Sequence, residues 1–363
     1  MRGLSKLIAK KSKLILVIAI LLLIPSAIGF LKTDINYDIL SYLPDNLSTT
    51  QAEKILKEDF NCGSLAMLIV ENMEDKDVSK LKEKVSKVDG VVDVLWIDDF
   101  LDLSVPKEML PKDINDLLYT DNSTLMVIKL EEGSASLKTL NAVESIRNIT
   151  GNQAFLSGMA SIIKDTKDIS DKETPLYVVI AVILTLIVLS FTMDSYVTPF
   201  IFLLSIGFAI IYNFGSNIIF GEISYITKAL SAVLQLGVTM DYSIFLLHRY
   251  DEERDKYDSH IDAMAIAIQN TTTSIFGSSL TTIAGFLALC AMDLALGMDM
   301  GLVMAKGVLL GVICTVTVLP ALILIFDKQI HKYKHRPILP TFKKSSEIVV
   351  KHYKKLVVLF LLL

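Results

Sequence analysis

The sequence predicts a polytopic α-helical membrane protein with 1+5 transmembrane helices, the start of a seventh, and one α+β domain outside the membrane. Of its 363 residues, 52% are apolar, and the mean hydropathy is +0.52. The charges are unevenly placed, because residues 32–174 hold 16 Lys and Arg against 27 Asp and Glu, whereas the later apolar runs hold very few. These observations exclude a purely soluble enzyme, a disordered chain and a disulfide scaffold.

The first apolar run, Leu14–Leu31, follows a basic stretch that contains Arg2 and four lysines. A cleaved signal peptide has the same pattern, but the length of the run and the lack of an A-x-A cleavage site favour an uncleaved anchor. Basic residues flank the cytoplasmic end of a membrane helix. Residues 1–31 are therefore expected to form a cytoplasmic N-terminus and the first transmembrane helix.

Five further apolar runs are long enough to cross a bilayer core of about 30 Å. They are Pro175–Met193, Thr198–Phe220, Ser224–Leu247, Ile275–Met292 and Leu302–Phe326. Pro175 is expected in the first turn of its helix, where the missing N–H costs nothing. The five runs define a transmembrane unit at 175–326. Alternation then places 32–174 outside the cytoplasm, and 327–353, with its seven Lys and Arg, inside it as a basic linker.

Residues 354–363 are expected to begin a seventh transmembrane helix. The apolar run Leu356–Leu363 reaches only about 12 Å as a helix, and the basic stretch before it repeats the pattern that precedes Leu14. Such a repeat is typical of duplicated transporters. The alternative is that two strings this short and simple match by chance. We therefore expect a missing C-terminal half, a second copy or a partner chain to complete the molecule.

The block at 32–174 alternates predicted helices and strands. The predicted helices are Ser48–Phe60, Asp77–Val88 and Ser136–Ile149, and the strands are Leu65–Val70, Val91–Ile97, Leu125–Leu130 and Gln153–Leu156. Ser48 or Thr49 is expected to cap the first helix, and Asp89-Gly90 to form a turn. The alternation favours an α/β or α+β sandwich of the split β-α-β kind with an acidic, solvated surface.

Asp241 is the most informative residue inside the apolar runs. It lies seventeen residues into the Ser224–Leu247 run, about 9 Å from its cytoplasmic end. Ionising a carboxyl group there is costly, so we expect it to hold a proton that exchanges when water or a cation approaches. The alternative is a carboxyl group that hydrogen-bonds to neighbouring hydroxyls and only fixes helix packing. Gly237, one turn earlier, leaves room beside it for another helix or for water.

Three other residues in the apolar runs are candidate partners of Asp241. Lys306 is either its opposite charge or an anchor that extends toward the membrane surface, with equal support for each. Thr281 or Thr282 could donate a hydrogen bond to the carboxylate across a helix interface. Thr281 also lies between Gly277 and Gly285 at four-residue spacing, which predicts close helix packing.

Three strings make the sequence recognisable. They are GVTMDYSIFLLHRYDEE (237–253), SSLTTIAGFLAL (278–289) and MAKGVLLGVICTVTVLPALILIFD (304–327). Together with the 1+5 arrangement, they resemble the first half of a resistance-nodulation-division (RND) transporter. The similarity is greatest to the MMPL (mycobacterial membrane protein large) branch, and the unit 175–326 is similar to the related sterol-sensing domain.

The resemblance implies an exporter in the cell membrane that is driven by the proton-motive force. In such proteins an Asp-Tyr pair, here Asp241 and Tyr242, takes part in a proton relay, and a matching pair comes from the second half. Outside domains of ferredoxin-like fold, called porter domains, pass on a lipid, an amphiphile or a hydrophobic drug. Adjacent helical residues point about 100° apart, so Tyr242 cannot share the face of Asp241.

Two other classes of function deserve comparison with the transporter. A sterol-sensing-like protein that binds lipid or acts as a scaffold, without transport turnover, would need no protonatable Asp241. The sequence contains no P-loop, GxSxG or HExxH motif, which argues against a membrane enzyme and against an ATP-driven pump. The expected partners are therefore the lipid bilayer and a hydrophobic or lipid substrate, with no nucleic acid, no metal and no cofactor beyond the proton gradient.

Overall fold

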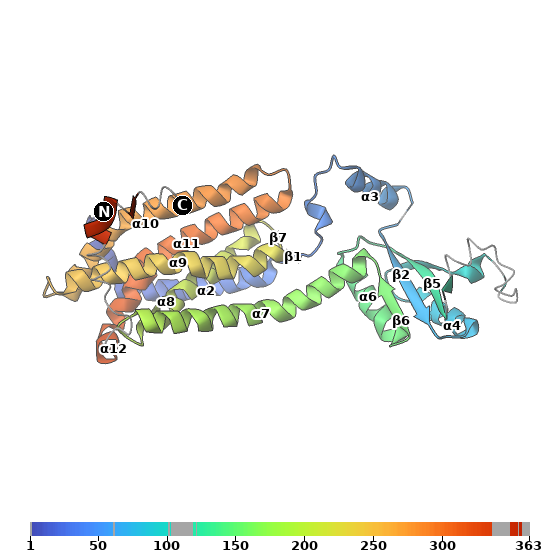
Figure 1. Cartoon of the computed structure of the whole chain (residues 1–363), viewed down its shortest axis with the longest axis horizontal. Coiled ribbons are helices and arrows are strands. Elements are labelled where there is room, and N and C mark those ends of the chain that lie inside the picture. Colours follow the sequence, from blue (N-terminus) through green and yellow to red (C-terminus); the bar gives the residue numbers. More distant parts are fainter. Residues whose placement is uncertain are drawn as a thin grey trace.

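The computed structural model describes residues 2–60, 62–100, 102, 119–120, 122–335, 349–354 and 356–357. It consists of a helical bundle and a smaller α+β domain, which the long helix α7 (Met159–Thr192) joins (Figure 1). We call the end of the bundle nearest the α+β domain the domain end, and the opposite end the far end. Of the predicted start of a seventh helix at 354–363, residues 354, 356 and 357 are helical, and the rest lie outside the described residues.

Six helices within the described residues are long and apolar enough to cross a membrane. They are α7 together with α2 (Ser12–Lys32), α8 (Thr198–Ser216), α9 (Tyr225–Arg254), α10 (His260–Ala288) and α11 (Ala295–Ile325). The predicted 1+5 arrangement of apolar helices is therefore present. α11 lies at the centre of the bundle, since it packs against α2, α8, α9 and α10.

The expectation that Pro175 begins a helix is wrong. α7 starts sixteen residues earlier, at Met159, and continues through Pro175 to Thr192. Its 34 residues reach about 51 Å, well beyond a bilayer core of about 30 Å. The first turns of α7 pack on the α+β domain through Ala160 and Ile163, which are buried. This packing, which a local rule cannot foresee, outweighs the preference of proline for a first turn, so the predicted boundary between 174 and 175 falls inside one helix.

Two short helices lie at the far end of the bundle. α1 (Arg2–Lys10) packs against α10 and α11, and α12 (Asp327–Lys332) follows α11 (Figure 1). The chain after α12 is fixed to the connection between α7 and α8, because the Ser195 hydroxyl donates to the Ile330 carbonyl at 2.8 Å and the His335 amide donates to the Asp194 carbonyl at 2.8 Å. The basic N-terminal segment and the start of the basic linker therefore share one end, and the α+β domain lies beyond the other.

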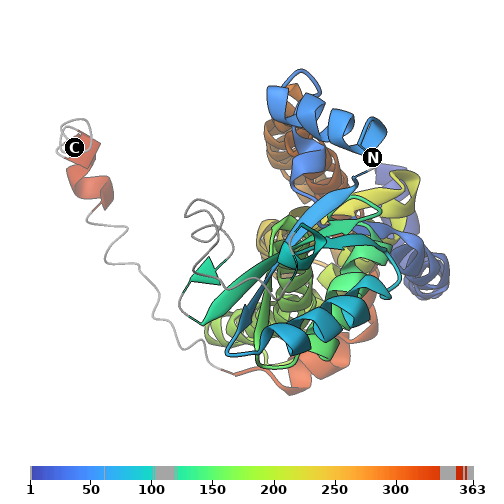
Figure 2. The same cartoon turned by 90° about the vertical axis from the view of Figure 1, so that its right-hand side faces the viewer.

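At the domain end, the chain that leaves α2 returns to the bundle as a short strand. β1 (Asp34–Asn36) pairs in parallel with β7 (Glu222–Ser224), which leads directly into α9. The short helix η1 (Leu40–Tyr42) and α3 (Ser48–Glu58) follow, and α3 lies apart from the other helices of the α+β domain in both views (Figures 1 and 2).

The α+β domain alternates strands and helices in the order β-α-β-β-α-β. Its elements are β2 (Ser64–Glu71), α4 (Asp75–Ser86), β3 (Val91–Leu95), β5 (Ser123–Leu130), α6 (Leu137–Thr150) and β6 (Ala154–Ser157), with the short β4 (Tyr119–Thr120) beside β5. The antiparallel sheet has the order β3-β5-β2-β6. Each β-α-β unit therefore holds a strand of the other unit between its own two strands.

Every second residue of β2 is buried, so the sheet has one face that packs in a core and one face that is exposed. Ala66, Leu68 and Val70 are at most 1% exposed and pack in one core with residues of α4 and α6, whereas Leu65 and Met67 are about half exposed. Figure 2 turns the α+β domain toward the viewer, with the bundle behind it.

The structure contains all the predicted helices and strands of this domain, with shifts of a few residues. Gly90 has φ +91°, as the predicted Asp89-Gly90 turn requires. The strand predicted to reach Ile97 stops at Leu95, because the Asp99 carboxylate accepts the Trp96 amide at 2.9 Å and bends the chain into a 3-10 turn. The expected cap of α3 is absent, since Leu47 occupies the N-cap position and makes no side-chain cap.

Candidate functional site: α9 and its neighbours

The site is built on α9, whose outward face carries Asp241. Gly237, Asp241, Phe245 and His248 recur at helical spacing, and all four are exposed on the surface of the bundle. No described residue makes a hydrogen bond or an ion pair with the Asp241 carboxylate. A Cβ atom added to Gly237 would meet nothing within 4 Å, so the predicted room beside Asp241 is present.

Asp241 lies deeper in its helix than the apolar run suggested. α9 continues past Leu247 to Arg254, which leaves about 20 Å of helix on the far side of Asp241 and about 24 Å on the domain side. The carboxyl group is therefore near the middle of α9. The side chain of Asp241 points away from the bundle core, so the described part of this chain does not enclose its carboxyl group.

Tyr242 has the opposite environment. It is 7% exposed and packs against Ile275 of α10 and Val312 of α11. The adjacent Asp241 faces outward, so the two members of the recognised pair lie on different faces, as their spacing requires. Tyr242 helps to fix α9 between α10 and α11.

Lys306 does not contact Asp241. From α11, its ammonium group donates to the Asn213 carbonyl at 3.1 Å and to the Asn217 Oδ1 atom at 2.5 Å. It also lies 5.0 Å from the centre of the Phe220 ring, close enough for a cation–π contact. Its partners belong to the domain end of α8 and to the residues after it, which is the geometry of an anchoring lysine.

Thr281 and Thr282 do not reach Asp241 either. Their hydroxyl groups donate to the carbonyl of Ser278, one turn back in α10, at 2.7 and 3.3 Å. Gly277, Thr281 and Gly285 are exposed, and a Cβ atom added to either glycine would meet nothing within 4 Å. The stripe therefore does not pack within the described part of this chain.

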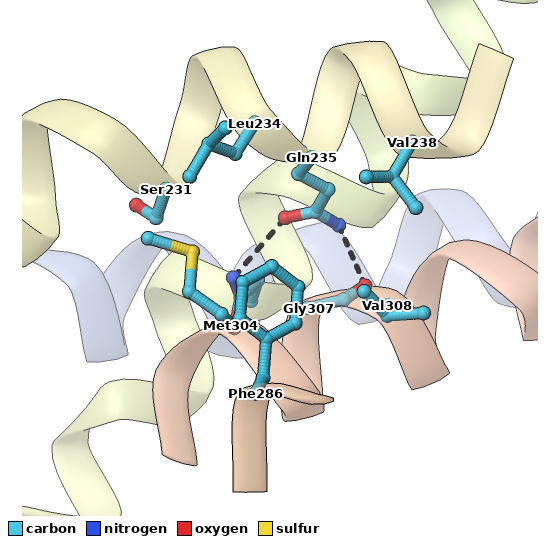
Figure 3. A pocket seen from close by; sticks show the side chains of 9 residues that line it. Ser231, Leu234, Gln235, Val238, Phe286, Met304, Gly307 and Val308 are labelled. Atoms are coloured by element: carbon cyan, nitrogen blue, oxygen red, sulfur yellow. Dashed lines mark hydrogen bonds between the residues drawn. The ribbon is translucent and has the colours of Figure 1, made fainter. Parts of the chain in front are cut away.

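A buried amide network between α8, α9 and α11 is a feature that the sequence reasoning missed. The Asn213 Nδ2 group donates to Gln235 Oε1 at 3.1 Å, and the Gln235 Nε2 group donates to the carbonyl of Gly307 at 3.0 Å (Figure 3). Ser231, Leu234, Val238, Phe286, Met304 and Val308 line the rest of this cavity of about 10 Å³. That volume is roughly enough for one water molecule. The sequence signal for this network was the presence of two uncharged amide residues, Asn213 and Gln235, within apolar runs.

Glycines allow this network to form. A Cβ atom on Gly307 would lie 2.6 Å from Asn213 Nδ2, and one on Gly311 would lie 2.6 Å from Thr239 Oγ1. α11 therefore approaches α8 and α9 closely at these two positions. Asn213 Oδ1 and Asn217 Nδ2 are buried and have no hydrogen-bond partner among the described residues.

A cluster at the domain end connects α9 with α7 and with the chain after α2. Asp171 of α7 accepts a hydrogen bond from the Tyr37 hydroxyl at 2.8 Å and lies 2.8 Å from Lys167 and 3.5 Å from Lys228 of α9. The Tyr37 ring stacks on Tyr225 at 5.6 Å. Burial and then the Asp171 carboxylate raise the pKa of Tyr37 above its usual value, so this hydroxyl stays protonated and donates at every physiological pH.

The first turn of α9 is also held by α11. The Asp299 carboxylate accepts the backbone N–H of Ser224 at 2.9 Å and a hydrogen bond from the Thr227 hydroxyl. A negative charge at a helix N-terminus is favourable, because the unpaired N–H groups there carry partial positive charge. α9 thus has a fixed N-terminal end, although Asp241 on its outward face has no partner among the residues that the structure describes.

Metal binding has no support in the described part of the chain, where no three His, Cys, Asp or Glu side chains are grouped to hold an ion.

Comparison with known proteins shows the family of this chain. Residues 41–346 match the MMPL family. A membrane protein of Methanocaldococcus jannaschii is 25% identical over 281 residues, which cover 70% of this chain and 71% of that protein.

Two of the related proteins are named as exporters. The apo-petrobactin exporter of Bacillus anthracis is 24% identical over 395 aligned positions, which cover 98% of this chain and 51% of the exporter. The siderophore exporter MmpL5 of Mycobacterium tuberculosis is 23% identical over 202 residues, which cover 54% of this chain and 21% of that protein. This chain thus spans about half the length of one exporter and aligns with a fifth of the other. Because the family match covers most of the sequence, the chain belongs to the MMPL family.

Proposed function

We propose that this chain is one half of a secondary transporter that couples inward proton flow to the export of a lipid, an amphiphile or another hydrophobic compound. The observation that carries the proposal is the position of Asp241, near the middle of an apolar helix and on the outside of the bundle. An ionised carboxylate is costly in a membrane unless a proton or an opposite charge neutralises it. Asp241 can therefore respond to a proton arriving from one side and leaving to the other.

The relatives support export rather than lipid sensing alone. Two relatives are named as exporters, one of apo-petrobactin and one of a siderophore, and a sterol-sensing-like scaffold would need no intramembrane carboxyl group. We propose that the chain is a transporter and not an enzyme, and that the proton gradient takes the place of a cofactor. Asp241 would carry the proton, whereas Tyr242 would hold the helix that presents it.

We further propose that the α+β domain is a ferredoxin-like porter domain in contact with the substrate. The β-α-β-β-α-β order and the interleaved antiparallel sheet support this assignment. The basic segments at the far end favour the cytoplasm for that end of the bundle. The N-terminus would then be cytoplasmic, and residues 32–174 would lie outside the cell membrane.

The second bundle would cover the outward face of α9 and α10. Asp241, Gly277, Thr281 and Gly285 are all exposed on the surface of this chain, and small residues at this spacing permit close approach of another helix. A C-terminal half, a second copy or a partner chain would place its own residues against Asp241 there. The Asp241 carboxyl group would then exchange its proton between two bundles.

The test is transport in proteoliposomes with an imposed pH gradient and a fluorescent phospholipid or hydrophobic dye as the probe. Asp241→Asn should abolish gradient-driven transport, because the amide keeps the shape but cannot take up and release a proton. Asp293→Asn is the matched control, since Asp293 is exposed between α10 and α11, outside the helices. Wild-type transport by the Asp241→Asn protein would refute the proton-carrying role.

A further inference from the structure

A polar groove leads from the far end of the bundle toward Asp241. It has a volume of about 460 Å³ and runs between α9 and α10. Its lining residues are Phe245, His248, Arg249, Glu252, Asn270 and Thr271. Phe245 lies four residues from Asp241 on the same face of α9, which is about 6 Å along the helix axis. Water in this groove thus comes within about one helical turn of the residue that carries the proton.

His248 and Glu252 are the titratable side chains of this groove that share the outward face of Asp241, and His248 is the nearer of the two. It lies seven residues further along α9, about 10 Å nearer the far end, and it is exposed. An imidazole ring accepts and releases protons in the physiological range. His248 therefore occupies the position that a proton would pass on its way from Asp241 to the far end.

His248 also lines a second cavity of about 30 Å³ on the other side of α9. The charged and titratable groups around that cavity are Asp194, Asp251, His331 and Lys334, which come from the connection between α7 and α8, from α9, from α12 and from the chain after it. The imidazole thus stands between the groove and a cluster that contains two carboxylates.

The charges that face His248 permit it to become positive. On the groove side, Arg249 is paired with Glu252 and Glu253, each at 2.8 Å, so its charge is largely compensated. On the cavity side, the carboxylates of Asp194 and Asp251 line the same space as Lys334 and His331. A transient imidazolium at this position has carboxylates on both sides.

We propose that His248 is the proton-release residue of this half-transporter. The proposal rests on the proposed function, with the far end in the cytoplasm. Protonated Asp241 gives its proton to groove water, which passes it to His248; Asp241 is left as a carboxylate and His248 as an imidazolium. The imidazolium then loses the proton to cytoplasmic water or to Glu252 and returns to its neutral form. The step needs no reactant other than water.

The experiment compares His248→Gln with wild type in proteoliposomes, with a pH dye on the far side and the same transport probe. Removal of a proton-transfer group of this kind slows turnover by about 10²-fold or more. We therefore expect at least a tenfold slower pH-gradient-driven flux, with the flux no longer dependent on far-side pH between about 5 and 8. The control is His260→Gln, because His260 is also at the far end but lines neither cavity.

Rescue separates proton transfer from a structural role. His248→Glu, which restores a proton acceptor, or added imidazole should recover most of the flux of the Gln variant. A slow His248→Gln variant that neither treatment rescues would overturn the proposal. A His248→Gln variant with the wild-type rate and pH dependence would also overturn it, and so would an equal loss of flux in His260→Gln. Failure of the proposed function looks different, since the wild-type protein itself would then show no gradient-driven transport.

Discussion

Lys306 and Asp241 show two different solutions for a charged residue in an apolar helix. Lys306 is half-buried and gives its hydrogen bonds to the neutral oxygens of Asn213 and Asn217. Asp241 has no partner in the described part of the chain and faces outward. The first residue contributes to the stability of the bundle, and the second is left available for a proton or for another bundle.

Lys306→Met should therefore lower stability rather than uncouple transport from the gradient. Asn217 is fully buried, and without Lys306 its Oδ1 atom would join its Nδ2 group in having no partner. Leaving a buried polar atom unpaired costs about 1–3 kcal/mol, which thermal unfolding in detergent would detect. The double variant Lys306→Met with Asn217→Leu should recover most of the loss. A variant that unfolds like wild type would show that the contacts of Lys306 contribute little.

The sequence singles out Asp241 as a candidate but does not specify its environment. A single charged residue in an apolar run is conspicuous, whereas its direction depends on how neighbouring helices rotate against one another. The expected contacts with Lys306, Thr281 and Thr282 are absent from the structure for that reason. The network of Asn213 and Gln235 escaped notice because uncharged amides in membrane helices carry a weaker signal than charges do.

At the scale of elements, two helices far apart in the sequence cross at a pair of glycines. A Cβ atom on Gly29 of α2 would lie 2.1 Å from the carbonyl oxygen of Gly215 in α8, and one on Gly215 would lie 2.2 Å from the carbonyl oxygen of Ser26. Both obstacles are backbone atoms, which cannot move aside as a flexible side chain can. The first transmembrane helix is thereby seated directly on the five-helix unit.

Gly215→Ala should consequently loosen the packing of α2 on α8. Forcing a methyl group into a filled interface costs about 1–3 kcal/mol, and here α2 must shift as a whole. Gly207→Ala on the same helix is the matched control, because its added Cβ atom would meet nothing within 4 Å and alanine favours the helix. Thermal unfolding of both variants in detergent measures the difference. Equal unfolding temperatures would contradict the close crossing.

Elements were predictable where local patterns and tertiary packing agree. The strands and helices of the α+β domain follow their apolar periods, and Gly90 supplies the positive φ of the turn that leads into β3. α7 is the exception. The apolar run begins at Pro175, but the sixteen residues before it continue the same helix because Ala160 and Ile163 are buried against other elements. No local pattern contains that information.

At the scale of the whole molecule, α7 and the cluster around Asp171 link the two parts. α7 contacts β2 and β6 in the α+β domain and α8 and α9 in the bundle. Asp171 adds contacts with Tyr37 and with Lys228, thirteen residues before Asp241 on α9. A shift of α9 that follows proton exchange at Asp241 would therefore also displace α7, the helix that supports the sheet.

Gly277→Leu should separate the two bundles of the proposed transporter while leaving this one folded. Gly277 is exposed on α10, and a Cβ atom added there meets nothing within 4 Å in the described part of this chain. If another helix approaches closely across the small-residue stripe, a leucine would hold it several ångströms away and displace its residues from Asp241. Gly207→Leu is the control, since a Cβ atom on Gly207 also meets nothing within 4 Å but Gly207 lies on α8.

Two measurements on the same proteins decide this prediction. Energy transfer between labelled bundles in liposomes should fall in Gly277→Leu, and gradient-driven transport should fall at least tenfold, as expected when a proton carrier loses its environment. The unfolding temperature should not change, because the side chain points away from the core. Full association together with wild-type transport would mean that the face of α10 around Gly277 is covered by lipid, and the second bundle would then have to meet Asp241 from the α9 side alone.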